Sequence, residues 1–289
     1  MAAKQLLRVT SGRTRHWVGD GFPVRSLISP QSDGAVLNPF LLLDYAGPEE
    51  FGPSETARGV GRHPHRGFET VTMVYQGELE YRDHSGARGT LIPGDVQWMT
   101  AASGLVHEEL HSETMTRNGG TIELLQLWVN LPAADKMSPP KYQDIASASI
   151  PEVALEGDAG LARVIAGELW GVRGPAETFS PITVWDVRLE AGGEVRLPVV
   201  GEHCSALVVL RGEVLLCSGE RAGTGEVAVF EGPGNSVGCA AELKSHLLVL
   251  SAEPIDEPVV VYGPFVMNTQ DEVKQAISDY QSGRMGRLQ

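Results

Sequence analysis

A chain of 289 residues has room for one large domain or two medium ones, and we expect two, each with its own core. Its 37 acidic and 23 basic residues give a formal net charge of −14, which argues against direct nucleic-acid binding. The N-terminus has no apolar signal segment and no run has the length of a membrane span, so we expect a soluble, cytoplasmic protein with no membrane contact.

Short apolar runs separated by glycine and proline fill the first half of the chain. The 34 Gly and 18 Pro residues are spread through the sequence, and long amphipathic helix patterns are nearly absent. This spacing is typical of an all-β sandwich or barrel. The strands expected here are residues 22–28, 40–45, 69–75, 79–83, 96–101, 106–110 and 122–130.

A proline-rich connection at residues 131–151 separates this half from the second. We therefore predict an N-terminal domain at residues 1–135 and a C-terminal domain at residues 136–289. The β pattern resumes in the second half, with strands expected at residues 162–166, 182–189, 194–198, 206–210, 213–217, 226–230 and 246–251.

The end of the chain carries the one clear helix pattern, over residues 269–282. Thr269 and Glu272 fit a capping box, and apolar residues recur at helical spacing from Val273 to Tyr280. We expect this helix to pack one face onto a barrel, and its sequence carries no functional signal.

The two halves resemble each other. Residues 74–80 (VYQGELE) match residues 209–215 (VLRGEVL), and residues 89–95 match residues 225–233 at a nearly equal offset. Such self-similarity predicts two β-barrels in tandem. The same offset carries His63 and His65 onto Pro198 and Val200, and it brings no histidine opposite His107, so only the first barrel has the histidines.

Two histidine motifs mark the first half, His63-Pro64-His65 and His107-Glu108-Glu109. On a strand, residues i and i+2 point to the same face about 7 Å apart, so each pair can reach one ion. Imidazoles combined with a carboxylate suit iron, manganese, nickel or copper and leave coordination positions open for chemistry. Because Pro64 removes one ladder hydrogen bond, we expect its strand at a sheet edge or a barrel mouth.

Strand parity favours one carboxylate over the others as a ligand. Glu109 shares the face of His107, whereas Glu108 points the other way and is expected to be solvated or salt-bridged. Glu69, four residues beyond His65, remains a rival ligand or a partner that orients a histidine.

Two further polar side chains lie near the motifs. His111 has the parity of His107 but lies too far along the strand to reach the same ion. Arg66 is expected either to hold a carboxylate or an anionic substrate, or to form a surface salt bridge.

Residues 63–72 (HPHRGFETVT), 93–101 (PGDVQWMTA) and 104–109 (GLVHEE) closely resemble the pirin family of the cupin superfamily. Residues 38–44 (NPFLLLD), 263–269 (GPFVMNT) and 279–284 (DYQSGR) are also similar to pirin segments, so the resemblance runs nearly end to end. Ala102 stands where the family often has glycine. The resemblance implies two stacked cupin (jelly-roll) barrels and one metal ion in the first, held by His63, His65, His107 and Glu109.

The resemblance implies two alternative functions. Some pirin-like proteins open quercetin with dioxygen, which would make this chain an oxidoreductase acting on quercetin or a related flavonol-type enol. Ring opening would release carbon monoxide, and Glu109 would take the substrate's 3-hydroxyl proton. Other pirins are described as metal-dependent partners of transcription factors or metabolic enzymes, which would make the chain a regulatory binding protein without turnover. A purely structural ion is a third interpretation and would need a closed coordination shell.

We expect one divalent ion, iron(II), with nickel, manganese, copper, cobalt or zinc as alternatives because ligand type does not select among them. The expected partners are a small aromatic or enolic substrate and O2, with a protein partner under the regulatory interpretation. We expect a monomer, because two barrels in one chain already supply the usual cupin pairing.

Overall fold

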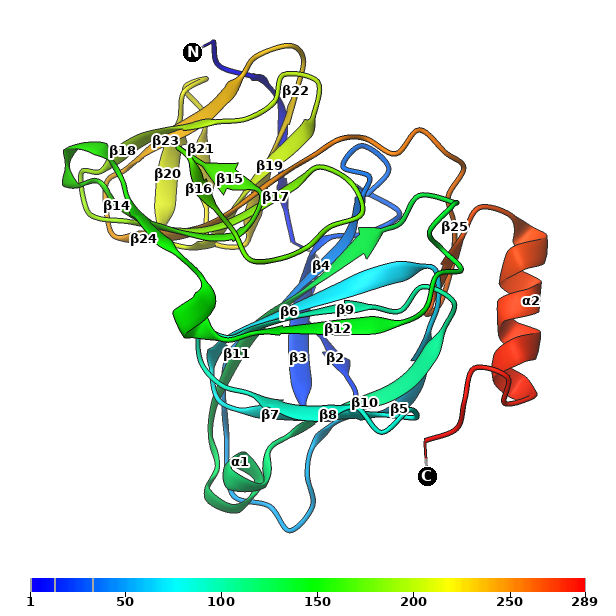
Figure 1. Ribbon diagram of the computed structural model, residues 1–289. Helices are drawn as coiled ribbons and strands as arrows, with labels where there is room; N and C mark the ends of the chain where they lie inside the picture. Colours follow the sequence, from blue (N-terminus) through cyan, green and yellow to red (C-terminus); the bar gives the residue numbers. More distant parts are fainter. Residues whose placement is uncertain (1, 13, 33, 289) are drawn as a thin grey trace. The chain divides into compact units, whose positions relative to one another are not determined.

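The computed structural model describes residues 2–12, 14–32 and 34–288, and the chain forms two compact units (Figure 1). We call the first the histidine unit; it comprises Thr14–Ser26, Leu42–Ser147 and Ile255–Gln289. The second unit comprises Met1–Arg13, Leu27–Leu41 and Ala148–Pro254. Among the described residues, no helix is long and apolar enough to cross a membrane.

The histidine unit is built from two sheets that face each other (Figure 1). Their strand orders are β12-β9-β6-β11-β4-β3-β2 and β5-β10-β7-β8, and the hairpin of β25 and β26 forms a separate two-stranded sheet. The bounds are β2 His16–Val18, β3 Phe22–Ile28, β4 Phe40–Phe51, β5 Gly59–His65, β6 Phe68–Gln76, β7 Leu79–Asp83, β8 Arg88–Leu91, β9 Val96–Thr100, β10 Leu105–His111, α1 Glu113–Asn118, β11 Gly120–Asn130, β12 Lys141–Ile145, β25 Val260–Tyr262, β26 Phe265–Met267 and α2 Gln270–Gln281.

The second unit has the same plan. Its sheets have the orders β1-β22-β19-β24-β17-β14-β13 and β18-β23-β20-β21, with a separate pair of β15 and β16. The bounds are β1 Gln5–Ser11, two 3-10 turns at Ser147–Ser149 and Glu156–Asp158, β13 Glu152–Ala154, β14 Gly160–Ala166, β15 Glu168–Leu169, β16 Val172–Arg173, β17 Ile182–Leu189, β18 Glu194–Pro198, β19 Cys204–Arg211, β20 Glu213–Leu216, β21 Arg221–Gly223, β22 Glu226–Glu231, β23 Ser236–Ala241 and β24 Ser245–Ala252.

The predicted duplication is confirmed by these orders, because β6 and β19 occupy equivalent places and each leads into its partner sheet through a glycine turn. Gly77 and Gly212 both have positive φ, +85° and +89°. Glycine adopts this conformation at little cost. A Cβ on Gly77 would also lie 2.7 Å from the Thr121 carbonyl oxygen, so the turn requires glycine for space as well.

The all-β prediction is also confirmed, and the strands predicted at residues 22–28, 79–83, 182–189 and 194–198 match the structure at both ends. Two of these strands alternate clearly: in β7, for example, Leu79, Tyr81 and Asp83 are buried while Glu80 and Arg82 are exposed. The C-terminal helix is confirmed as α2, with both hydrogen bonds of the predicted capping box present.

The compact units differ from the predicted division at residues 135 and 136. Strand β1 pairs with β22, and its Leu6 and Val9 pack on the core of the second unit. In the histidine unit, α2 contacts the β25–β26 hairpin, and Ala276 shares an apolar cluster with Val106 and Phe265. The N-terminal segment thus belongs to the second unit and the C-terminal segment to the histidine unit. A single boundary along the chain cannot represent this arrangement, because it depends on long-range contacts.

The N-terminal segment is tied to the second unit by a buried lysine. Lys4 is 4 % exposed, and its Nζ donates to the carbonyl oxygens of Gly201, His203 and Gly232 at 2.6, 2.8 and 2.9 Å. Burial lowers the pKa of this amine. Burying an ammonium group costs free energy unless its three N–H donors are hydrogen-bonded, and the three carbonyl oxygens would lose their donor without it.

Replacing this lysine should therefore destabilise the second unit. In Lys4→Met the three carbonyl oxygens lose their shared donor, which should reduce the free energy of unfolding by about 1 to 3 kcal/mol. Urea denaturation measures the change. Lys244→Met is the control, because Lys244 is exposed and its salt bridge, with Glu190, lies on the surface; equal losses in the two variants would contradict the role given to Lys4.

Candidate metal centre

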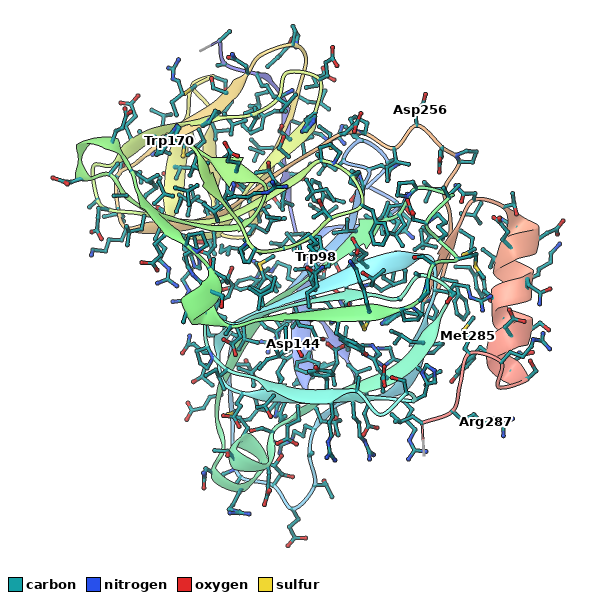
Figure 2. All side chains as sticks on the ribbon, viewed as in Figure 1. Trp98, Asp144, Trp170, Asp256, Met285 and Arg287 are labelled. Carbon is teal, nitrogen blue, oxygen red and sulfur yellow. The ribbon has the colours of Figure 1, made fainter. Side chains whose placement is uncertain are left out.

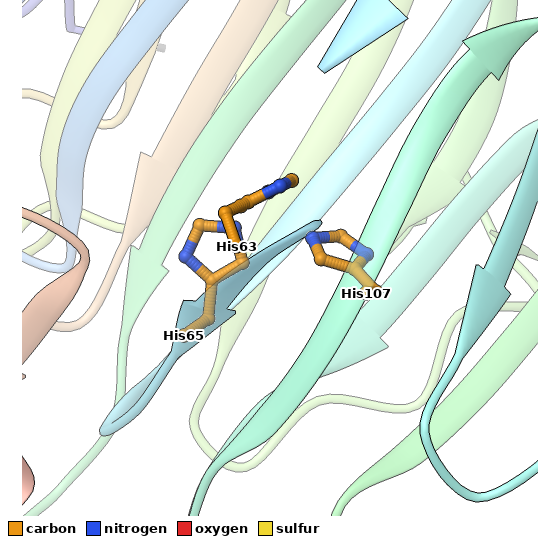
Figure 3. A group of neighbouring side chains, drawn as sticks. All are labelled: His63, His65 and His107. Atoms are coloured by element: carbon orange, nitrogen blue, oxygen red, sulfur yellow. The ribbon is translucent and has the colours of Figure 1, made fainter. Parts of the chain in front are cut away.

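The pairing of β5 with β10 brings three histidines together. His107 lies directly opposite His63, and Leu105 lies opposite His65. The ring centroids are 4.3 Å apart for His63 and His107, 4.7 Å for His63 and His65, and 5.0 Å for His65 and His107. One ring nitrogen from each residue lies within 4.8 Å of the other two, and Figure 3 shows the rings converging on a common space. These three residues form a candidate metal site.

Two of the rings are removed from water. His65 is 4 % exposed and His107 is fully buried, whereas His63 is partly exposed. Burial lowers the pKa of both buried imidazoles well below the ordinary value, and the neighbouring His63 lowers it further. Both rings are therefore neutral near pH 7, the state in which a ring nitrogen can bind a metal.

The nitrogens of these buried rings lack ordinary partners. Those of His107 and His65 make no hydrogen bond of standard geometry with a described residue, although the Pro264 carbonyl lies beside His65. Leaving such groups unpaired in a protein interior costs about 1 to 3 kcal/mol each. A cation between the rings would satisfy them, so the donor set fits a divalent metal.

The backbone orients the third ring. Gly61 and Arg62 lie where the pairing register of β5 and β10 shifts between His107 and Glu109, which is a bulge in the ladder. His63 Nδ1 lies 2.8 Å from the Gly61 carbonyl oxygen. A ring protonated at Nδ1 donates to this oxygen and keeps its lone pair on Nε2, as in many metal-binding histidines.

Glu109 lies on the same face as His107 but outside the group of three ring nitrogens. Its carboxylate accepts hydrogen bonds from Gln126 Nε2 at 3.1 and 3.3 Å, and Thr72 Oγ1 lies 3.5 Å away. The carboxylate also lines a cavity of about 20 Å³, enough for one water molecule. Glu109 is thus held beside the histidines by a neutral amide, which is a suitable setting for a proton acceptor.

The other two carboxylates face elsewhere. Glu108 lies on the opposite face of β10, where Arg82 pairs with it and Arg62 lies 4.0 Å away, so it is salt-bridged. Glu69 points away from the histidines, because the adjacent Phe68 is the residue whose ring contacts His65. Glu69 instead accepts a hydrogen bond from Thr100 Oγ1 at 2.7 Å, and burial raises the pKa of Glu69 to about 7. The structure does not place Glu69 in the site.

His111 and Arg66, which lie near the motifs in the sequence, make contacts outside the group of three histidines. The His111 ring packs edge-on against Phe22 and Phe51, with Nε2 3.1 Å from the Gly21 carbonyl oxygen. Arg66 forms a salt bridge, but a buried one with Asp279 of α2 rather than a surface pair.

Polarity changes along the interior of the histidine barrel. Apolar residues such as Val74 and Leu124 fill one end. Glu109 is contacted by the next inward residues: Thr72, two residues before Val74 on β6, and Gln126, two residues after Leu124 on β11. Phe68 and Trp128 then reach His65, with centroids 5.1 and 5.7 Å from its ring. The histidine end of the barrel is therefore lined by aromatic rings, and the middle by polar groups.

Several of these surrounding residues were not predicted from the sequence. Gln126 and Trp128 alternate on the inner face of β11, and a polar residue in that apolar strand was the available signal. Tyr142 on β12 is stacked on Tyr81, with ring centroids 5.2 Å apart. Tyr81 of β7 donates at 2.5 Å to Asp144 of β12, which is labelled in Figure 2, and this bond links the two sheets. Neither tyrosine belonged to a recognisable motif.

The equivalent positions in the second unit are apolar. Counting from the shared glycine turn, Leu216 of β20 corresponds to Tyr81, and its partner Cys239 corresponds to Glu109. Two residues earlier, Val237 replaces His107, and its partner Leu197 replaces His63. The repeat offset had pointed one residue further, to Pro198. Among the described residues, no other set of three histidine, cysteine or acidic side chains converges as the three histidines do.

Comparison with known families matches both units. The family model described as Pirin matches residues 21–129, and the one described as Pirin C-terminal cupin domain matches residues 184–286.

Individual relatives cover nearly the whole chain. A Pseudomonas aeruginosa protein named "Putative quercetin 2,3-dioxygenase" is 53% identical over 284 residues, 98% of this chain and 99% of its own. Pirin-like protein 2 of Arabidopsis thaliana is 39% identical and covers 93% of this chain and 81% of its own. The crystal structure of a quercetin 2,3-dioxygenase from Acinetobacter baumannii is 47% identical with a TM-score of 0.97, and all of both chains is covered. With both domains matched and this degree of identity, the chain belongs to the pirin family of cupin proteins.

Proposed function

We propose that this protein is a metal-dependent dioxygenase that opens quercetin or a related flavonol-type enol with O2. The observation that carries the proposal is the cluster of His63, His65 and His107, with a held carboxylate on the next inward position of the same strand. The names of the Pseudomonas and Acinetobacter relatives support the choice of substrate class.

The three histidines would hold one divalent ion, for which we propose iron(II). Bound there, the ion supplies Lewis acidity toward an enolate oxygen and redox chemistry with dioxygen. Its identity and the fourth ligand, for which Glu109 is the candidate, are parts of the proposal. The aromatic rings of Phe68 and Trp128 beside His65 keep bulk water from that side. His63, the partly exposed member, marks the side open to substrate.

Glu109 has the second role. Its carboxylate would take the proton of the substrate's 3-hydroxyl group, which converts the flavonol to the enolate that reacts with O2. Gln126 donates to both oxygens of Glu109 and so holds the carboxylate plane in place. The overall reaction incorporates one O2 into the ring-opened product and releases one carbon as carbon monoxide.

Removal of one histidine tests the metal site. His107→Ala should weaken binding of iron(II) beyond the roughly 10- to 100-fold typical of losing an outer partner, because a direct donor is lost. Metal analysis after dialysis measures occupancy, and quercetin absorbance under oxygen measures turnover. His16→Ala, an exposed histidine on β2, is the control. The proposal fails if protein with confirmed iron, nickel, manganese or copper occupancy never changes the quercetin absorbance.

Glu109→Gln separates proton transfer from metal binding. The amide cannot accept the proton, so kcat should fall about 100- to 10,000-fold, while the three histidines still retain the ion. Glu108→Gln is the matched control on the opposite face of β10, and its turnover should stay within about threefold of wild type. Full turnover in Glu109→Gln would remove the residue from the mechanism, and loss of the metal would make it a ligand first.

A further inference from the structure

Arg66, the residue that follows His65, joins three parts of the histidine unit. Its side chain is 6 % exposed. Nε donates to the Ser103 carbonyl oxygen at 2.7 Å, and Nη1 donates to Asp279 Oδ2 at 2.8 Å. Ser103 lies just before β10, and Asp279 lies on α2. One guanidinium therefore connects the end of β5, the approach to β10 and the C-terminal helix.

The backbone of Arg66 is fixed by the C-terminal hairpin. Its N–H donates to the Pro264 carbonyl oxygen at 3.2 Å, and its own carbonyl oxygen accepts from the Val266 N–H at 3.0 Å. The Pro264 carbonyl also lies beside the His65 ring. The segment before α2 therefore reaches one of the three histidines directly.

A second buried cation supports the same turn. Lys136 is 1 % exposed, and its Nζ donates to the Gly67 carbonyl oxygen at 2.7 Å, to Val266 at 3.1 Å and to Asn130 Oδ1 at 2.6 Å. The approach is tight, because a Cβ on Gly67 would lie 1.9 Å from the Val266 carbonyl oxygen. The turn after His65 is thus held against the hairpin from two sides.

The far side of the link is equally well packed. Asp279 also accepts from Gln275 and Arg284 at 2.7 and 2.6 Å, which fixes its carboxylate. Met285, just beyond α2 (Figure 2), packs in a cluster with Val106, the residue before His107. Buried ion pairs contribute little net stability compared with apolar replacements of the same shape. Their fixed geometry is what distinguishes them.

We propose that Arg66 and Asp279 are positioning residues of the histidine site, and that α2 sets the spacing between His65 and His107. This inference rests on the proposed metal site. Arg66 restrains β5 immediately after His65, and through Ser103 it restrains the segment leading to His107. Without the Arg66–Asp279 pair, β5 and β10 can shift relative to each other, and a metal centre is sensitive to displacements of a fraction of an ångström.

Asp279→Asn tests the link, because the amide keeps the shape of the carboxylate and removes its charge. The affinity for cobalt(II), measured by chelator competition, should fall on the order of tenfold, and the visible absorption bands of the bound cobalt should change as the ligand geometry changes. Asp271→Asn is the matched control on the same helix, because Asp271 is exposed and its salt bridge with Lys274 lies on the surface. It should match wild type in affinity and spectrum.

A merely structural role would lower the thermal stability of the metal-free protein without altering the cobalt spectrum, and that outcome would overturn the inference. Arg66→Lys provides the second variant, since it keeps the charge but cannot make both guanidinium hydrogen bonds. Its cobalt spectrum and affinity should lie between those of wild type and those of Asp279→Asn. Unchanged affinity and spectrum in both variants would also overturn it. If wild-type protein binds no metal, both the positioning role and the proposed function fail. If wild-type protein binds cobalt but the iron form never turns over quercetin, the proposed reaction fails and the positioning role stands.

Discussion

The histidine site depends on one register, the pairing of β5 with β10 that sets His107 opposite His63. A slip of one residue would turn each histidine to the other face of the sheet. β5 is an edge strand, as Pro64 predicted, so the ladder holds it on one side only. The missing support on the open side comes from the C-terminal hairpin through Arg66, Lys136 and the Pro264 carbonyl. The edge strand that carries two of the histidines is therefore held in place by contacts from elsewhere in the chain.

The second barrel shows that the fold does not require this polar interior. With the same strand order, it places Leu197, Val237 and Cys239 where the histidine unit has His63, His107 and Glu109. These apolar side chains join one continuous core. In the histidine unit the apolar cluster fills one end of the barrel. The buried rings of His65 and His107, whose nitrogens make no hydrogen bond of standard geometry to a described residue, occupy the other end at a cost in stability. A polar interior kept at such a cost is typical of a functional site.

Much of this arrangement could be predicted from the sequence, because it follows from short-range rules. Short apolar runs bounded by turn residues located β7 and β17, and the i and i+2 rule paired His63 with His65 and His107 with Glu109. Short edge strands such as β2, β8 and β13 were missed because their residues are mostly exposed. The repeat offset missed Leu197 by one residue, since pairing register and bulges are not visible in an alignment. Glu69 could be assigned to the outer face only when Phe68 was seen against His65.

The contact of Arg66 with Asp279 was beyond such rules, since 213 residues separate them. That separation has a consequence during synthesis. At about 5 to 20 residues per second, a ribosome needs about 10 to 40 s to make the intervening chain. For most of that interval, once His107 has been made, the nascent chain carries all three histidines without the hairpin and helix that brace them. The proposed brace of the three histidines is therefore complete only after residues 255–289 have been made.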